Sequence, residues 1–194
     1  MNGFASRDGG MPPTSFTNGP KASCPFPTVP SAILHHVSLY PEYKAAIDLS
    51  GDVPRQMTYR QLQQRSQMLA RNLQAHGVCP GDRVPLVVKR GIEMLVGISA
   101  ILLCGAQYVP LDGGVVAEKT LETVVAQSGK TFAVCIASTR HRFESSGSHA
   151  LRRCTVVVIE AESDDDNAEM TEEFPSLATS EGGCYVIYTS GMYS

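Results

Sequence analysis

Two kinds of apolar pattern alternate along the chain from Ser31 onward. One is a short run of consecutive apolar residues, which is typical of a strand buried on both faces of a parallel sheet. The other repeats apolar residues with the spacing of an α-helix. The alternation predicts an α/β fold with a mostly parallel sheet flanked by helices. The predicted strands are residues 45–49, 57–59, 84–88, 108–111, 131–136, 155–159 and 184–188.

Helices are predicted between these strands from their spacing and their end signals. Ser31 is a candidate N-cap for the first helix. Thr58 is placed to cap the second helix, and Gly77 is placed to end it in a left-handed conformation. Residues 91–103 are apolar nearly all round, which predicts a buried helix, and another helix is predicted at residues 117–127.

The composition excludes several classes of protein. The chain has 194 residues, of which 43% are hydrophobic and 18% are charged, so most of it can bury a core. No apolar run approaches the roughly 18 residues that a membrane-spanning helix needs. The net charge is −3 and there is no tryptophan, so neither a membrane nor a nucleic acid is expected as a partner.

The cysteines and histidines are not spaced as metal ligands. The six cysteines are far apart and form no Cys-x-x-Cys pair, so neither a metal centre nor a disulfide framework is expected. Cys104, Cys135 and Cys184 lie in apolar runs, where a thiol behaves as a small buried hydrophobe. His141 and His149 are assigned to a polar loop.

Two segments are polar without periodicity. Residues 1–30 are rich in Gly, Pro, Ser and Thr, which predicts a flexible leader before a folded part at residues 31–194. The first residues lack the apolar stretch of a secretory signal, so a cytoplasmic location is expected. Residues 151–194 hold 2 basic and 9 acidic side chains, against 14 basic and 10 acidic in residues 1–150. The acidic stretch at about 160–173 predicts a solvated loop rather than a cation site, because it lacks the glycine turn and terminal glutamate of a calcium loop.

The last predicted strand is followed by a segment with candidate chemistry. Residues 184–188 continue directly into Thr189, Ser190 and Gly191. A hydroxyl-bearing turn with glycine after a strand can offer backbone N–H groups and side-chain hydroxyls to phosphate oxygens. Taken alone this signal is weak, because many strands end in such turns.

Three segments in order resemble the core motifs of adenylate-forming (AMP-binding) enzymes, especially the adenylation domains of nonribosomal peptide synthetases. Residues 58–62 (Thr-Tyr-Arg-Gln-Leu) resemble the first motif, and residues 102–112 resemble the second. Residues 185–191 resemble the start of the third motif, the phosphate-binding loop. Residues 81–84 also suit the family, and the resemblance covers residues 26–191. It implies the N-terminal subdomain of the adenylate-forming fold.

The resemblance also implies an activity. Members of the family activate an amino acid or other carboxylic acid with ATP and magnesium, forming an acyl-adenylate and pyrophosphate. The acyl group then passes to the phosphopantetheine thiol of a carrier domain or to coenzyme A, here in secondary-metabolite biosynthesis. Thr189, Ser190 and Gly191 would belong to an incomplete ATP phosphate-binding loop. No catalytic residue or metal ligand of the family is matched by a position in this sequence.

Four positions in and after the second motif depart from the family pattern. Leu103 replaces a lysine, Cys104 and Gln107 replace two alanines, and Gly113 stands where a proline is usual. Because this motif is chiefly structural in the family, we expect these changes to affect packing rather than chemistry.

The third motif is followed by only Met192, Tyr193 and Ser194, where the family continues a glycine-rich loop. We therefore expect residues 31–194 to be an incomplete adenylation domain, inactive by itself and poorly soluble. A retained intron, a pseudogene and a deliberate truncation are alternative origins for this ending.

Two alternative functions stay open at this point. The chain could be part of an acyl-CoA or aryl-CoA ligase of the same superfamily, or a non-catalytic α/β docking module. The amino-acid sequences of residues 108–112 and 188–191 are closer to the motifs of the peptide synthetases and favour that type. The identity of the acid substrate cannot be predicted, because the family's pocket-lining residues are not matched in this sequence.

Overall fold

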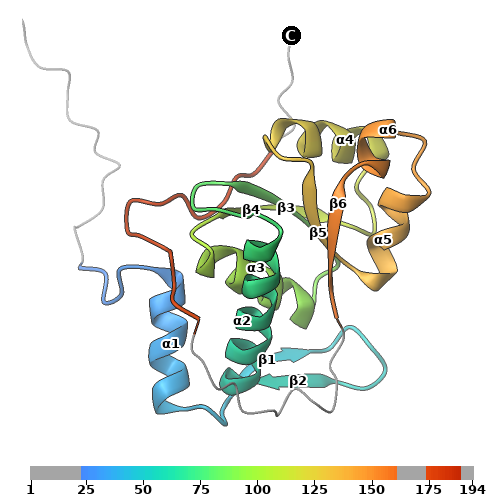
Figure 1. The fold of residues 1–194 in the computed structure, drawn as a ribbon. Coiled ribbons are helices and arrows are strands. Elements are labelled where there is room, and N and C mark those ends of the chain that lie inside the picture. Colours follow the sequence, from blue (N-terminus) through green and yellow to red (C-terminus); the bar gives the residue numbers. More distant parts are fainter. Residues whose placement is uncertain (1–22, 161–173, 189–194) are drawn as a thin grey trace, which may run out of the picture.

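Four of the apolar runs form one parallel sheet at the centre of the structure (Figure 1). This computed structural model describes residues 23–160 and 174–188. The strand order is β4-β3-β5-β6, and every neighbouring pair is parallel. The strands are β3 (Arg83–Val88), β4 (Gln107–Asp112), β5 (Phe132–Ile136) and β6 (Thr155–Ile159). The predicted α/β fold with a mostly parallel sheet is confirmed.

Helices cover both faces of this sheet (Figure 1). Leu86 and Val88 pack with α2 and α3, whereas Val87 between them packs with α4, α5 and α6. Successive side chains of a strand point to opposite faces, so β3 has to be apolar on both. The helices are α1 (Val29–Leu39), α2 (Tyr59–Ala75), α3 (Ile92–Leu103), α4 (Glu118–Gln127), α5 (Ala137–Glu144) and α6 (His149–Arg152).

Helix α3 is buried, as its apolar composition predicts. Eight of its 12 residues are buried. The helix approaches the sheet so closely that a Cβ on Gly97 would lie 2.6 Å from Leu86 Cδ1. Glycine at this position therefore permits the contact between α3 and β3.

Strands β1 (Lys44–Asp48) and β2 (Arg55–Thr58) form a separate antiparallel pair. They are the predicted segments 45–49 and 57–59, joined through a turn at Gly51. Met57 of β2 is fully buried and belongs to the core cluster shared with α2 and α3. This side chain fastens the hairpin to the rest of the fold.

The ends of α2 follow the predicted signals, whereas α1 begins earlier than predicted. Thr58 Oγ1 accepts a hydrogen bond from Gln61 N, and Gly77 adopts φ +84° after the helix. The N-cap of α1 is Thr28, and Ser31 instead completes a capping box by accepting from Thr28 N. Both residues are good caps, and this reciprocal pairing places the start at Thr28.

The predicted flexible leader and acidic loop lie largely outside the described residues. Residues 1–22 of the leader and 161–173 of the loop are not described, so both remain predictions. The last part of the leader contacts α1, because the rings of Phe26 and His35 lie 5.0 Å apart.

The polar segment that holds His141 and His149 is helical rather than a loop. His141 lies on α5 and His149 begins α6. Helix α5 buries only Thr139 and Phe143, so its sequence lacks a clear apolar period. The Thr139 hydroxyl donates to the backbone oxygen of Val87 on β3 at 2.7 Å, a tertiary contact that helps to place the helix.

Two of the three cysteines in apolar runs are buried, as predicted. Cys104 and Cys135 are fully buried, and burial raises the pKa of their thiols to about 12 and about 11. Cys184 is only half-buried, because it lies in the surface segment described below. All six cysteines are free.

Candidate functional site

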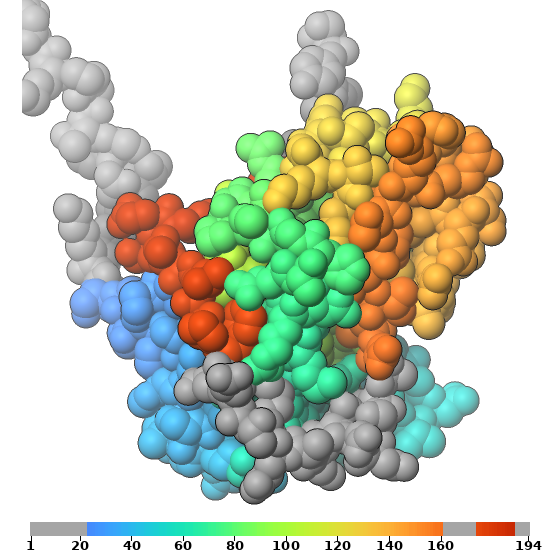
Figure 2. Space-filling view, viewed as in Figure 1, coloured from blue at the N-terminus to red at the C-terminus, as the bar shows by residue number. Residues whose placement is uncertain are grey.

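The predicted phosphate-binding residues Thr189, Ser190 and Gly191 lie outside the described residues. What the structure describes is the segment that leads to them, residues 174–188, which we call the strap. Figure 2 shows the strap, in red, at the molecular surface beside α1, in blue. Phe174 is buried at its start and lies under the guanidinium group of Arg71, 5.8 Å from the ring centre.

The strap joins the edge of the sheet beside β4. Tyr108 N donates to Cys184 O at 3.3 Å, and Val186 N donates to Tyr108 O at 3.0 Å. These bonds make a parallel bridge between Tyr108 and Tyr185. The strap therefore runs in the direction of β4, toward the carboxyl edge of the sheet, which is where open α/β sheets bind ligands.

The predicted strand at residues 184–188 is wrong, because only this single bridge forms. In a parallel ladder, every second residue of a strand faces the same neighbour, so the backbone of Pro110 faces the strap as that of Tyr108 does. Proline has no N–H to donate to the strap, and the ladder cannot continue past Tyr108. Tyr185 and Ile187 are accordingly left more than half exposed.

The strap packs against the second motif, residues 102–112. Gly105 adopts φ +69° between α3 and β4, and a Cβ there would lie 2.6 Å from Leu177 O. Leu177 N donates to Leu103 O at 2.8 Å. A Cβ on Gly183 would lie 2.6 Å from the side chain of Gln107. The close contacts between the strap and the second motif therefore depend on the absence of a Cβ at Gly105 and Gly183.

The departures from the family pattern are accommodated by packing. Leu103 and Cys104 are buried, and Cys104 Sγ lies 3.5 Å from Ala70 O on α2. A Cβ on Gly113 would lie 2.5 Å from Thr139 Cγ2. Glycine instead of proline at position 113 thus makes room for the side chain that ties α5 to β3.

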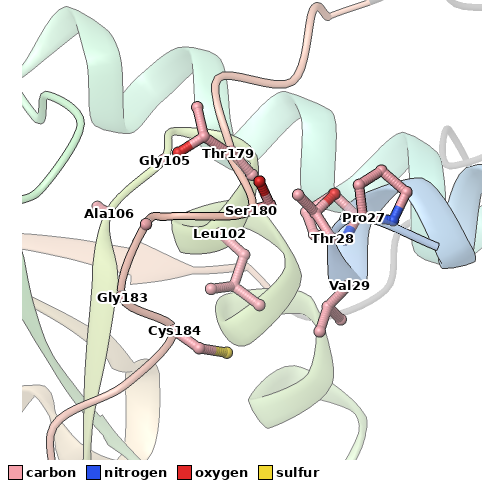
Figure 3. A pocket seen from close by; sticks show the side chains of 13 residues that line it. Pro27, Thr28, Val29, Leu102, Gly105, Ala106, Thr179, Ser180, Gly183 and Cys184 are labelled. Atoms are coloured by element: carbon pink, nitrogen blue, oxygen red, sulfur yellow. The ribbon is translucent and has the colours of Figure 1, made fainter. Parts of the chain in front are cut away.

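A groove of about 170 Å³ separates the strap from the start of α1. Figure 3 shows Thr28 and Val29, at the start of α1, on one side of it and Ser180 and Cys184 of the strap on the other, with Leu102 between them. The Thr28 hydroxyl is already engaged in the helix cap. The groove therefore lies between α1, α3 and the strap.

The carboxyl ends of β3 and β4 form a second hollow of about 160 Å³. Its charged lining residues are Arg90 after β3 and Asp112 at the end of β4. Asp112 Oδ1 accepts from Gly114 N at 2.9 Å, and Gly113 N donates to Val88 O at 3.0 Å. These backbone bonds hold the two loops together at the edge toward which the strap runs.

An ion-pair cluster fastens the β1–β2 hairpin to the start of α3, close to this edge. Arg55 donates to Asp48 Oδ2 at 2.7 Å and to Glu93 Oε1 at 2.6 Å. Hydrogen bonds from Ser50 and then from Arg55 hold the pKa of Asp48 well below its usual value. The hydrogen bond from Arg55 likewise lowers the pKa of Glu93, against the opposing effect of burial.

Within residues 23–160 and 174–188, no group of three or more His, Cys, Asp or Glu side chains is placed to hold a metal ion. Among these same residues, no helix has both the length and the apolar character that crossing a bilayer requires.

The sequence matches the profile of the AMP-binding enzyme family over residues 33–192. The chain belongs to this family. It is 31% identical over 173 residues to adenylate-forming reductase 03009 of Coprinopsis cinerea, covering 89% of this chain and 16% of that protein. It is 33% identical over 146 residues to phosphinothricin tripeptide synthetase PhsB of Streptomyces viridochromogenes, covering 75% of this chain and 12% of that protein.

A solved structure of a nonribosomal peptide synthetase contains the same fold. The AMPPNP-bound nonribosomal peptide synthetase FmoA3 superposes with a TM-score of 0.72 at 21% identity, over 90% of this chain and 17% of that one. The chain therefore corresponds to the N-terminal portion of the adenylation domains of peptide synthetases. The relatives themselves are several times longer.

Proposed function

We propose that the protein to which this chain belongs activates an amino acid or another carboxylic acid with ATP as an acyl-adenylate. In this proposal the second motif and the strap support the phosphate-binding loop that begins at Thr189. The observation that carries it is the parallel bridge between Tyr108 and Tyr185, which directs the chain toward the carboxyl edge of the sheet. The match to the AMP-binding family over residues 33–192 supports the same activity.

The chemistry assigns a task to each group of the loop. The substrate carboxylate attacks the α-phosphorus of ATP, and pyrophosphate leaves. Negative charge on the phosphate oxygens has to be met by donors that are already in position. The hydroxyls of Thr189 and Ser190 and the backbone N–H of Gly191 are the donors that we assign. Magnesium would supply further charge neutralisation, but we assign it no ligands and no step, since the described residues hold no cluster for it.

The fate of the adenylate separates two candidate proteins. In a peptide synthetase the acyl group passes to the phosphopantetheine thiol of a carrier domain, and this is our first candidate. The adenylate-forming reductases of Coprinopsis cinerea favour a second candidate, in which a hydride donor reduces the activated acyl group to an aldehyde and the group that carried the acyl leaves. Mass spectrometry of the product distinguishes the two, because a thioester on a carrier domain or a released aldehyde would be detected. A cytoplasmic location stays a prediction.

The test is substrate-dependent ATP–pyrophosphate exchange by the complete protein, screened across amino acids and other carboxylic acids. Ser190→Ala is expected to lower exchange by about 10²-fold, the usual cost of losing one donor to a charged transition state. Ser38→Ala is the matched control, since Ser38 lies on α1 and bonds only locally to His35 O. Absence of exchange with every acid, or full activity of Ser190→Ala, would contradict the proposal.

The 194-residue chain alone is expected to give no exchange. The chain spans 16% or less of the two relatives compared above, and the part of it that the structure describes contains no cluster of metal-binding side chains. The same assay on the purified chain checks this expectation. Any acid-dependent exchange by the chain itself would show that it is incorrect.

A further inference from the structure

The side chain of Gln107 packs against the strap just before the strap reaches the edge of the sheet. A Cβ on Gly183 would lie 2.6 Å from both Cδ and Nε2 of Gln107 and 3.1 Å from its Cγ. The glutamine side chain therefore lies directly against the backbone of Gly183. Alanine, the residue of the family pattern at position 107, has none of these three atoms. The contact thus depends on the longer side chain that this sequence has in its second motif.

Gln107 is itself held in place by its backbone. Its N–H donates to Asp82 O at 2.8 Å, and it pairs with Arg83 where β3 and β4 begin. The next residue, Tyr108, forms the bridge to the strap. The Gln107 side chain therefore contacts the strap from a fixed point of the sheet, one residue away from that bridge.

The register of the strap on β4 is set close to this contact. Among residues 174–188, no backbone hydrogen bond to β4 follows the one from Val186 N to Tyr108 O. The point at which the chain reaches Thr189 therefore depends on which strap residue lies opposite Tyr108. A parallel bridge can form again after a slip of two residues, because every second residue faces the same neighbour. Such a slip would move the strap by about 6–7 Å.

The contact between Gln107 and Gly183 opposes such a slip. A slip of two residues would bring Glu181 or Tyr185 to the place of Gly183, and each has a Cβ in the space that Gln107 now occupies. The glutamine would have to rotate away and lose its contact with the strap. Register is otherwise weakly specified in a segment with adjacent glycines such as Gly182 and Gly183.

We propose that Gln107 is a positioning residue, which fixes the register of the strap and thereby places the phosphate-binding loop. The effect on ATP rests on the function proposed above, whereas the effect on the register does not. Gln107 contacts the strap and acts on the loop only through it.

Steady-state kinetics of the complete protein test the effect on ATP. Gln107→Ala should raise the KM for ATP in ATP–pyrophosphate exchange about tenfold, equivalent to one weakened hydrogen bond to a charged group, and leave the KM for the acid unchanged. Gln107→Met keeps a side chain of similar length and should restore most of the affinity. Gln127→Ala, exposed at the end of α4, is the matched control. A variant that is merely less stable would lose maximal rate and keep both KM values.

A double mutant shows whether Gln107 acts through Gly183. Gly183→Ala should raise the KM for ATP in the wild-type background, because the new Cβ displaces the Gln107 side chain. In the Gln107→Ala background it should have no further effect, so the two changes are not additive. Additive effects would overturn the proposal.

Two measurements separate this proposal from the adenylation activity. In Gln107→Ala we expect faster hydrogen exchange at the Val186 amide and weaker binding of a non-hydrolysable ATP analogue, whether or not any acid is activated. If the wild-type protein binds the analogue but activates no acid, the adenylation proposal fails and these measurements still decide the role of Gln107. Unchanged exchange at Val186, or unchanged affinity for the analogue, would overturn that role. A wild-type protein that does not bind the analogue would overturn both proposals.

Discussion

Replacing Gly105 by alanine should loosen the strap that leads to the predicted loop. Gly105 adopts φ +69°, a left-handed conformation that costs a residue with a Cβ about 1–2 kcal/mol. The new Cβ would also lie 2.6 Å from Leu177 O, which belongs to the backbone and cannot rotate away. The strap therefore has to move to relieve the contact.

The magnitude follows from what that movement breaks. Leu177 N donates to Leu103 O at 2.8 Å, and a displaced strap loses this bond, which contributes about 0.5–1.5 kcal/mol. Adding the backbone strain, Gly105→Ala should lower the free energy of unfolding by about 1.5–3.5 kcal/mol. Gly77→Ala is the matched control, because Gly77 has φ +84° and a Cβ there would meet nothing within 4 Å. It should cost only the strain, about 1–2 kcal/mol.

Two assays separate the strain from the strap contact. Denaturant unfolding of both variants gives the difference in stability, and hydrogen exchange gives the protection of the Leu177 amide. We expect faster exchange at Leu177 in Gly105→Ala and unchanged exchange in Gly77→Ala. Equal losses of stability in the two variants, with Leu177 still protected, would refute the reasoning.

Three further predictions concern contacts that hold the site together. The pKa values of Asp48 and Glu93 are lowered in the folded state. These carboxylates therefore stabilise the folded state at a pH above their ordinary pKa values of 3.8 and 4.5, and the stabilisation is lost as the pH falls through the lowered pKa values. Arg55→Met should therefore lower Tm at pH 7 and weaken the fall of Tm below pH 4.5; an unchanged pH profile would contradict this. Thr139→Val removes a buried hydrogen bond to β3 and should cost about 1–3 kcal/mol in denaturant unfolding, and a neutral result would mean that this bond does not hold α5. Pro110→Val supplies the missing N–H toward the strap and should slow hydrogen exchange in residues 186–188; unaltered exchange would rule out proline as the cause of the broken ladder.

The elements of the fold that are set by local patterns were predictable from the sequence. The continuous apolar run at 84–88 predicted β3 to within one residue, and the Thr58 and Gly77 signals placed the ends of α2. These signals work because burial on two faces, capping and a left-handed turn depend on residues close together in the chain. Helix α5 was not predicted, because its own sequence carries no apolar period from which a helix could be read.

The order of motifs in the sequence was enough to indicate the AMP-binding family, which the comparison confirmed. The assignment of Thr189, Ser190 and Gly191 to a phosphate-binding loop remains a prediction from that order. The acid substrate could not be predicted, because the family's pocket-lining residues are not matched in this sequence.

Contacts between distant residues were decided only by the tertiary structure. Pro110 is compatible with a strand, and its missing N–H matters only because the strap lies on that side of β4. Gly113 departs from the family pattern for a reason that becomes visible once Thr139, 26 residues later, lies against it. Arg55 joins Glu93 across 38 residues. Local patterns determine which segments are strands and helices, but pairing depends on distances in space that no local pattern encodes.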